Sequence, residues 1–277
     1  MRRRSRILAA TALLVSVWAA SGPAAERAIT LASTTSTENS GLLDHLLPLF
    51  ERATGIRVRV VALGTGQAIK VARNGDADLL LVHHTASEEA FVAAGYGVKR
   101  YQVMSNDFVL VGPNADPAGI GGLGDAAVAL GRIAAAEAVF VSRGDESGTH
   151  KKERALWRAA GLTPAAAGGR WYREAGAGMG ATLNLAAAMG AYALSDRATW
   201  VSFANKGDLK VLVEGDGRLF NPYGVILVNP ARHPHVKAKD AQAFIDWLIG
   251  APGQAAIAAF RINGRQLFFP DAQTPGR

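Results

Sequence analysis

The fold of this chain is decided by one stretch, residues 138–150, which reads Ala138-Val139-Phe140-Val141-Ser142-Arg143-Gly144-Asp145-Glu146-Ser147-Gly148-Thr149-His150. Its first four residues predict a short buried strand, and the charged segment from Lys151 predicts a helix. The loop between them therefore faces a helix N-terminus, where free backbone N–H groups and the helix dipole favour an anion. Arg143 and the hydroxyls of Ser147 and Thr149 add further donors. Taken alone, the segment leaves a second interpretation open, a helix cap beside a surface arginine.

The same order of strand, loop and helix recurs along the chain. We expect strands at 28–32, 56–63, 77–82, 108–111, 138–141, 191–194, 210–213 and 225–228. We expect helices at 41–52, 66–73, 87–94, 126–137, 151–160, 181–189, 239–248 and 252–260. Within the first of these helices Pro48 predicts a kink or an early end, and Gly55 predicts its closure. The alternation predicts an α/β fold whose sheets are mostly parallel and flanked by helices, with ligands bound beyond the carboxyl ends of the strands.

Four of the strand-to-helix loops are rich in hydrogen-bond donors. Besides 142–150 they are the hydroxyl run 33–37, the glycine-containing loop 64–67 and the loop 176–182. Each one alone is an ordinary turn composition. Because the carboxyl ends of parallel strands meet at one edge of a sheet, we expect these loops to gather around a single small anion.

The first 25 residues predict a secretory signal peptide. Four arginines precede an apolar run from Ile7 to Ala20, and small residues follow it, so cleavage is expected after Ala24 or Ala25. Export through either the general or the twin-arginine route is compatible with Arg3-Arg4. The chain has no cysteine, so we expect neither disulfides nor a lipid anchor but a soluble periplasmic protein.

Composition argues against several classes of function. The formal charge of +7 falls to +3 when the four arginines of the leader are removed, which gives no case for nucleic-acid binding. The six histidines form no metal-ligand spacing, and no Gly-x-Ser-x-Gly nucleophile elbow occurs. The spacing of Gly176, Gly178 and Gly180 is a poor dinucleotide fingerprint. We therefore expect a binding protein without cofactor or metal cation rather than an enzyme.

Several motifs resemble those of the tungstate-binding proteins of tungstate ABC importers. The resemblance runs along nearly the whole mature chain and rests on Ser33-Thr34-Thr35-Ser36, Gly64-Thr65-Gly66-Gln67-Ala68, Ala77–His83, Asn106–Pro113, 142–150 and Asn221–Val225. The family's first motif opens with threonine, and Ser33 keeps the hydroxyl there. The 142–150 segment is also similar, more distantly, to a loop of periplasmic phosphate-binding proteins.

The resemblance implies a two-lobed periplasmic binding protein of type II topology with the ligand cleft between the lobes. One lobe would hold residues 26–106 plus 222–277 and the other residues 107–221. It implies anion contacts at Thr34, Thr35, Thr65, Arg143, Ser147, Gly148 and Thr149, with Ser36 and Thr182 as further candidates. The expected partners are the permease and ATPase subunits of an ABC importer, and the expected state is a monomer.

Candidate anions differ in the hydrogen bonds that they require. Tungstate and molybdate are dianions that only accept hydrogen bonds, so a site made of donors suits them, whereas hydrogen phosphate also needs an acceptor. Asp145 could serve as that acceptor but is expected to hold the Arg143 guanidinium in place. The residues leave open molybdate, sulfate, phosphate and a role as a periplasmic oxyanion sensor, and only the resemblance favours tungstate.

Overall fold

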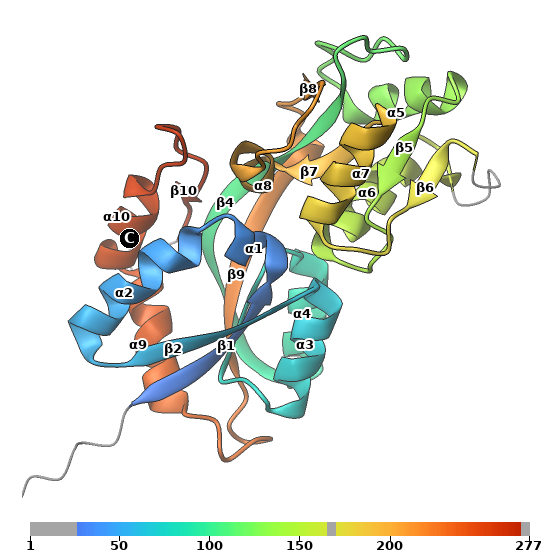
Figure 1. Cartoon of the computed structure of the whole chain (residues 1–277). Coiled ribbons are helices and arrows are strands. Elements are labelled where there is room, and N and C mark those ends of the chain that lie inside the picture. The colour runs from blue at the N-terminus through green and yellow to red at the C-terminus, as the bar shows by residue number, and fades with distance from the viewer. Residues whose placement is uncertain (1–26, 165–169, 273–277) are drawn as a thin grey trace, which may run out of the picture.

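The computed structural model describes residues 27–164 and 170–272, so the predicted signal peptide lies outside the described residues. Figure 1 shows two lobes joined by long strands. The strands are β1 (Ala28–Thr34), β2 (Arg57–Leu63), β3 (Leu79–Val82), β4 (Gly97–Pro113), β5 (Phe140–Ser142), β6 (Tyr172–Glu174), β7 (Ala193–Asp196), β8 (Leu209–Val213), β9 (Phe220–Val228) and β10 (Phe269–Pro270). The helices are α1 (Thr35–Asn39), α2 (Leu42–Thr54), α3 (Thr65–Asn74), α4 (Thr85–Ala93), α5 (Ala126–Ala135), α6 (Gly148–Ala159), α7 (Met179–Met189), α8 (Arg197–Ser202), α9 (Ala238–Ile249) and α10 (Ala251–Ala259), with a 3-10 turn η2 (Gly217–Leu219).

The first lobe is built on a sheet with the strand order β10-β4-β9-β3-β1-β2. β1 pairs in parallel with β2 and β3, as expected for strands that alternate with helices. The core of this lobe is formed by apolar side chains of this sheet and of α2, α9 and α10. The carboxyl ends of β1, β2 and β3 therefore lie at one edge, where loops 33–37 and 64–67 leave the sheet.

The second lobe is built around the distal half of β4. From Phe108 onward this strand pairs with β7, and its last residues pair with β8. β5 and β6 form a separate parallel pair, which an isolated parallel bridge from Phe140 to Tyr192 joins to the segment before β7. Two apolar clusters fill this lobe, one around Trp157 and Tyr192 and the other around Leu183.

As expected, β1 pairs in parallel with β2 and β3, and β5 pairs in parallel with β6, whereas every pair that involves β4 or β9 is antiparallel. β9 runs antiparallel to both β3 and β4, and β4 runs antiparallel to β7, β8 and β10. The reason is topological, since a strand that leaves one lobe and another that returns to it lie side by side in opposite directions. The α/β class itself is confirmed, with mixed sheets.

The passage between lobes is marked by buried amide side chains on paired strands. Asn106 of β4 lies opposite Asn221 of β9, and the Asn221 amide donates to Asn106 Oδ1 at 2.6 Å. Immediately beyond them, β4 exchanges β9 for β7 as its neighbour. We propose lobes of 26–106 plus 222–277 and 107–221 on this basis.

Some local features differ from the sequence-based expectation. The hydroxyl run does not stay a loop, because Thr34 Oγ1 accepts from the Thr37 N–H and caps the short helix α1. α8 begins in the same way, with Asp196 accepting from the Thr199 N–H at 2.8 Å. Pro48 does not end α2 early, and the helix continues to Thr54 before the left-handed Gly55. The burial of one apolar face of α2 outweighs the hydrogen bond that Pro48 removes.

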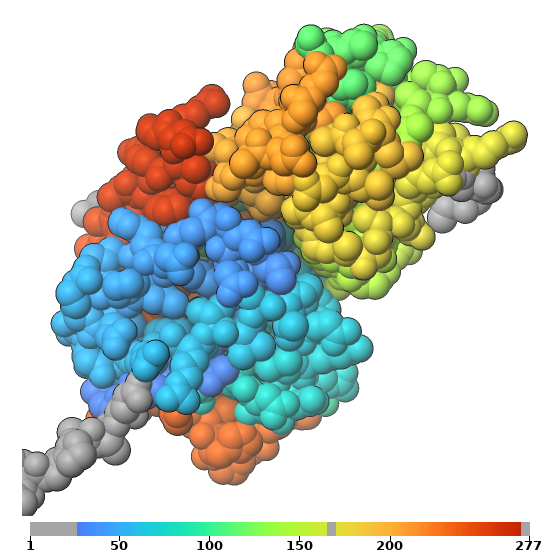
Figure 2. All heavy atoms as spheres, in the orientation of Figure 1, coloured from blue at the N-terminus to red at the C-terminus, as the bar shows by residue number. Residues whose placement is uncertain are grey.

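The two lobes touch each other in this structure. Ala198 of α8 is fully buried in the apolar cluster of the first lobe, and Val201 packs against the clusters of both lobes. Figure 2 shows blue N-terminal residues lying against the orange and yellow surface of the second lobe. Within the described ranges no helix has the length and apolarity needed to span a membrane.

We expect Leu46→Ala to lower the free energy of unfolding by about 2–5 kcal/mol, because Leu46 is buried in the first-lobe core and its loss leaves a cavity. Urea unfolding followed by circular dichroism measures the change. Leu185→Ala in α7 is the matched control, since that leucine is 37% exposed and should cost less than about 1 kcal/mol. Equal losses in the two variants would contradict this assignment of the core.

Candidate anion-binding site

The loop before α3 and the loop before α6 meet directly across the lobes. The N–H of Gly148, first residue of α6, donates to Thr65 Oγ1, first residue of α3, at 2.9 Å. A Cβ added to Gly148 would lie 3.0 Å from Thr65 Oγ1 and 3.1 Å from His83 Cε1, so this approach needs a glycine. The N–H of Gly148 is thus engaged with Thr65, whose hydroxyl keeps its own proton free to donate.

The first loop contributes a cluster of buried hydroxyls. Thr34 Oγ1 lies 2.7 Å from Thr37 Oγ1 and 3.1 Å from Ser36 Oγ. The Ser33 hydroxyl already donates its proton to the carbonyl of Leu81. Thr35 is half-buried and begins α1. The structure therefore brings Thr34 and Ser36 together, and Thr35 follows at the start of the helix.

The loop of residues 142–147 holds its arginine in a fixed position. Arg143 is 2% exposed, and its guanidinium pairs with Asp145 Oδ2 at 2.5 Å. The other carboxylate oxygen of Asp145 accepts from the Ser147 N–H at 3.2 Å. The predicted role of Asp145 as the group that orients Arg143 is confirmed. Ser147 Oγ accepts from the His150 N–H and so caps α6.

Two buried donors of this region have no hydrogen-bond partner in the described structure. They are Nε of Arg143 and the Oγ1 hydroxyl of Thr149, both on side chains that are almost completely buried. A buried donor without a partner costs free energy, so a ligand that supplied an acceptor here would be stabilised. Both flank the N-terminus of α6, whose dipole favours negative charge.

Thr182 lies at the start of α7 and is also buried. Its hydroxyl donates to the carbonyl of Gly178 at 3.1 Å. The side chain therefore serves the first turn of its own helix, and its place among the anion ligands stays a prediction.

His83, which was not among the predicted site residues, closes the site toward the crossover strands. The ring is buried, lies 3.1 Å from Ser36 Oγ through Nε2 and 3.1 Å from Asn221 Oδ1 through Nδ1, and stacks on Tyr223. Burial and, to a smaller degree, the positive charge of Arg143 lower the pKa of His83 to about 4. Its position directly after β3, at the edge where the loops gather, is the signal that could have indicated it.

Asp196 is a second group that the sequence analysis did not single out. It is buried at the end of β7, and burial raises the pKa of its carboxyl while Arg143 acts in the opposite direction. One of its oxygens caps α8 and the other lacks a partner in the described structure. Asp196 therefore places an acidic group within electrostatic range of Arg143.

Comparison with known proteins gives the family of this chain. The family model described as a PBP superfamily domain matches residues 19–252. A tungstate-binding protein TupA of Peptoclostridium acidaminophilum is 48% identical over 252 residues, covering 90% of this chain and 87% of the relative. The chain belongs to the PBP superfamily, in the family of the TupA proteins.

Solved structures of this family have the same fold. The tungstate-binding protein TupA of Desulfovibrio alaskensis G20 is 48% identical, with a TM-score of 0.77 over 89% of this chain and all of its own. A structure described as the tungstate ABC transporter of Geobacter sulfurreducens is also 48% identical, with a TM-score of 0.79 over 86% of this chain and all of its own. The prediction of a solute-binding protein rather than an enzyme is confirmed by this membership.

Across residues 27–164 and 170–272 no group of three or more histidine, aspartate or glutamate side chains gathers in a way that could ligate a metal cation. The hydrogen-bond donors described above are hydroxyls, backbone N–H groups and the Arg143 guanidinium.

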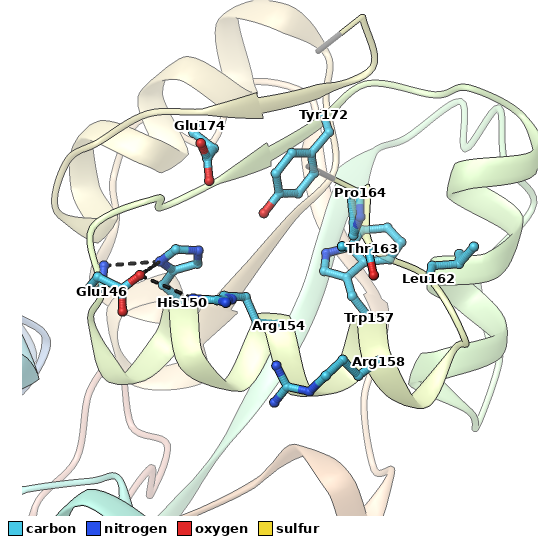
Figure 3. Close-up of a pocket in the computed structure, with 10 residues that line it drawn as sticks. All are labelled: Glu146, His150, Arg154, Trp157, Arg158, Leu162, Thr163, Pro164, Tyr172 and Glu174. Atoms are coloured by element: carbon cyan, nitrogen blue, oxygen red, sulfur yellow. Dashed lines mark hydrogen bonds and ion pairs between the residues drawn. The ribbon is translucent and has the colours of Figure 1, made fainter. Parts of the chain in front are cut away.

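A cavity of about 260 Å³ is lined by residues of α6, of β6 and of the segment that follows α6 (Figure 3). Arg154 and His150 face Glu146 there, with Arg154 Nη1 3.3 Å from Glu146 Oε1. Beside it Glu153 is buried, and its Oε1 accepts from Tyr172 Oη at 2.7 Å and from Trp157 Nε1 at 3.2 Å. Glu153 thereby ties α6 to β6, and its hydrogen bond with the Ser142 side chain reaches the start of the loop that carries Arg143.

We expect Glu153 to contribute to stability at low pH, and we expect this contribution to be lost as the pH rises from about 4.5 to 7. Burial raises the pKa of Glu153 from 4.5 to about 7, so the folded state binds a proton that the unfolded state has released in this range. In Glu153→Gln this contribution should be absent, which changes the difference in stability between pH 4.5 and 7.5 by on the order of 2 kcal/mol relative to the wild type. Unfolding free energies at pH 4.5 and 7.5 test this, with exposed Glu51→Gln as control, and a wild-type pH dependence in Glu153→Gln would contradict it.

Proposed function

We propose that this protein captures tungstate between its two lobes and delivers it to an ABC importer. The observation that carries the proposal is the pair of buried, unpartnered donors, Arg143 Nε and Thr149 Oγ1, at the N-terminus of α6. Relatives that are 48% identical over most of the chain are named as tungstate-binding proteins, which supports the choice of anion.

The chemistry of the site suits a dianion that only accepts hydrogen bonds. Thr65 and Thr149 offer hydroxyl protons, Arg143 offers a fixed cation, and the α6 terminus offers the helix dipole. Each oxygen of Asp145 already accepts one hydrogen bond, from Arg143 or from the Ser147 N–H, so this carboxylate serves first to hold the guanidinium in place. Thr34, Thr35, Ser36, Ser147, Gly148 and Thr182 complete the proposed set of contacts.

Molybdate has nearly the same hydrogen-bonding requirements, and we propose it as a second ligand. We also propose a monomer in the periplasm that docks on permease subunits after closing. The Geobacter relative described as part of a tungstate ABC transporter supports the transport role. A thermal-shift screen with tungstate, molybdate, sulfate, phosphate and chromate orders the anions. A protein that is stabilised by phosphate alone would contradict the proposal.

Arg143→Ala should weaken tungstate binding by about 2–5 kcal/mol, that is by at least roughly 30-fold. The reason is that Arg143 is the buried cation beside the α6 terminus and its Nε has no protein partner in the described structure. Calorimetric titration measures the change. Arg154→Ala in α6 is the control, because that side chain is 54% exposed and pairs with Glu146. Wild-type affinity in Arg143→Ala would refute its role.

Thr149→Val should lower the affinity by about 1.5–3 kcal/mol, because it removes one donor to a charged acceptor and conserves the volume of the side chain. The same titration measures it, and a thermal melt without ligand shows whether folding is intact. Thr163→Val changes an exposed threonine on the same lobe and should bind as wild type does. If both variants bind alike, Thr149 does not contact the anion.

A further inference from the structure

His83 connects the hydroxyl cluster of the first loop to the strands that cross between the lobes. Its Nε2 lies 3.1 Å from Ser36 Oγ and its Nδ1 lies 3.1 Å from Asn221 Oδ1. The Asn221 amide nitrogen donates to Asn106 Oδ1 at 2.6 Å, and the Asn106 amide nitrogen lies 3.4 Å from Tyr223 Oη. All of these side chains are buried.

The directions of these hydrogen bonds follow from the partners. Since Asn221 donates through its nitrogen to Asn106, the atom that it turns to His83 is its carbonyl oxygen, which can only accept. His83 Nδ1 therefore carries a proton. A neutral imidazole has one N–H, so Nε2 has none and must accept from the Ser36 hydroxyl.

In this arrangement the Ser36 hydroxyl donates its proton in a hydrogen bond to His83 Nε2. A dianion that only accepts hydrogen bonds then meets an oxygen lone pair at Ser36 instead of a proton. The remaining hydroxyl neighbour is Thr34, 3.1 Å from Ser36 Oγ. As long as His83 is neutral, Ser36 cannot complete a site made of donors.

The surroundings of His83 keep it neutral when no anion is bound. Arg143 from the loop after β5, Lys152 from α6 and the adjacent His84 are the charged neighbours that act on it, and all of them disfavour a second proton. Tyr223 of β9 stacks on the ring at 4.9 Å and stays uncharged, because burial raises its pKa well above the ordinary value. The buried Asp196 acts on Tyr223 and Arg143 from β7. A bound dianion would reverse this balance by placing two negative charges beside the ring.

We propose that His83 is a positioning residue for the anion, which takes up one proton at Nε2 when a tetrahedral dianion binds and thereby turns the Ser36 hydroxyl into a donor. The proton comes from solvent, Nε2–H then donates to Ser36 Oγ, and the freed Ser36 O–H points to an anion oxygen. Nδ1 keeps its bond to Asn221 throughout. This inference rests on the proposed function, because it needs a dianion in the cleft.

Calorimetric titration of the protein with tungstate at pH 6.5, in buffers of different ionisation enthalpy, counts the protons taken up. We expect close to one proton per anion in the wild type, and a Kd that rises by up to about tenfold per pH unit between pH 6.5 and 8.5. Wild-type binding with no proton uptake and a flat Kd over this range would overturn the inference. Absence of any tungstate binding would instead contradict the proposed function.

Two variants test whether the proton that is taken up binds to His83. His83→Gln supplies an amide that cannot titrate, and Ser36→Ala removes the hydroxyl that requires the switch while it leaves the His83 ring in place. Both should bind tungstate with little proton uptake and a Kd that hardly changes with pH, and Ser36→Ala carries the test if His83→Gln does not fold. His150→Gln is the matched control, because His150 also lies near the loop but outside this network, and it should keep the wild-type uptake. Uptake that persists in Ser36→Ala and His83→Gln, or that is lost in His150→Gln alone, would overturn the assignment.

Discussion

The antiparallel pairing of β4 with β9 is the interaction on which the rest of the structure depends. β4 belongs to the sheets of both lobes, and at the point of crossing Asn106 and Asn221 bond to each other in a buried environment. Buried amides must be hydrogen-bonded, so this pair resists a change of register. A slip of either strand by one residue would turn the inward face of that strand outward. The crossing therefore fixes which loops of one lobe face which loops of the other.

The side chains at the lobe junction carry little net charge. Arg143 supplies a cation held by Asp145, Asp196 lies within its electrostatic range, and His83 is neutral because it is buried. The attraction for an anion then comes from oriented donors and the α6 dipole, which act strongly where water is excluded. Such a site can favour a dianion without carrying a large net positive charge.

Most elements of the fold could be predicted from the sequence, because apolar periodicity and glycine positions are local properties. The segment 138–150 was correctly interpreted as strand, loop and helix, and the contact of Asp145 with Arg143 follows from residues two apart. The short helices α1 and α8 were missed, since each depends on one capping side chain. The antiparallel partners of β4 were missed because pairing between strands about a hundred residues apart leaves no local pattern.

The sequence by itself determined the α/β alternation, the four donor-rich loops and the presence of one well-placed arginine. Only the tertiary structure decided what each donor does, since Thr65 receives the Gly148 N–H, Thr182 serves its own helix, and Arg143 Nε and Thr149 Oγ1 stay without a partner in the described structure. The protonation of His83 at Nδ1 likewise follows from its hydrogen bond to Asn221, which is distant in the sequence. The physical reason is that a hydrogen bond depends on distance and direction in space, and neither is fixed by the residue type alone.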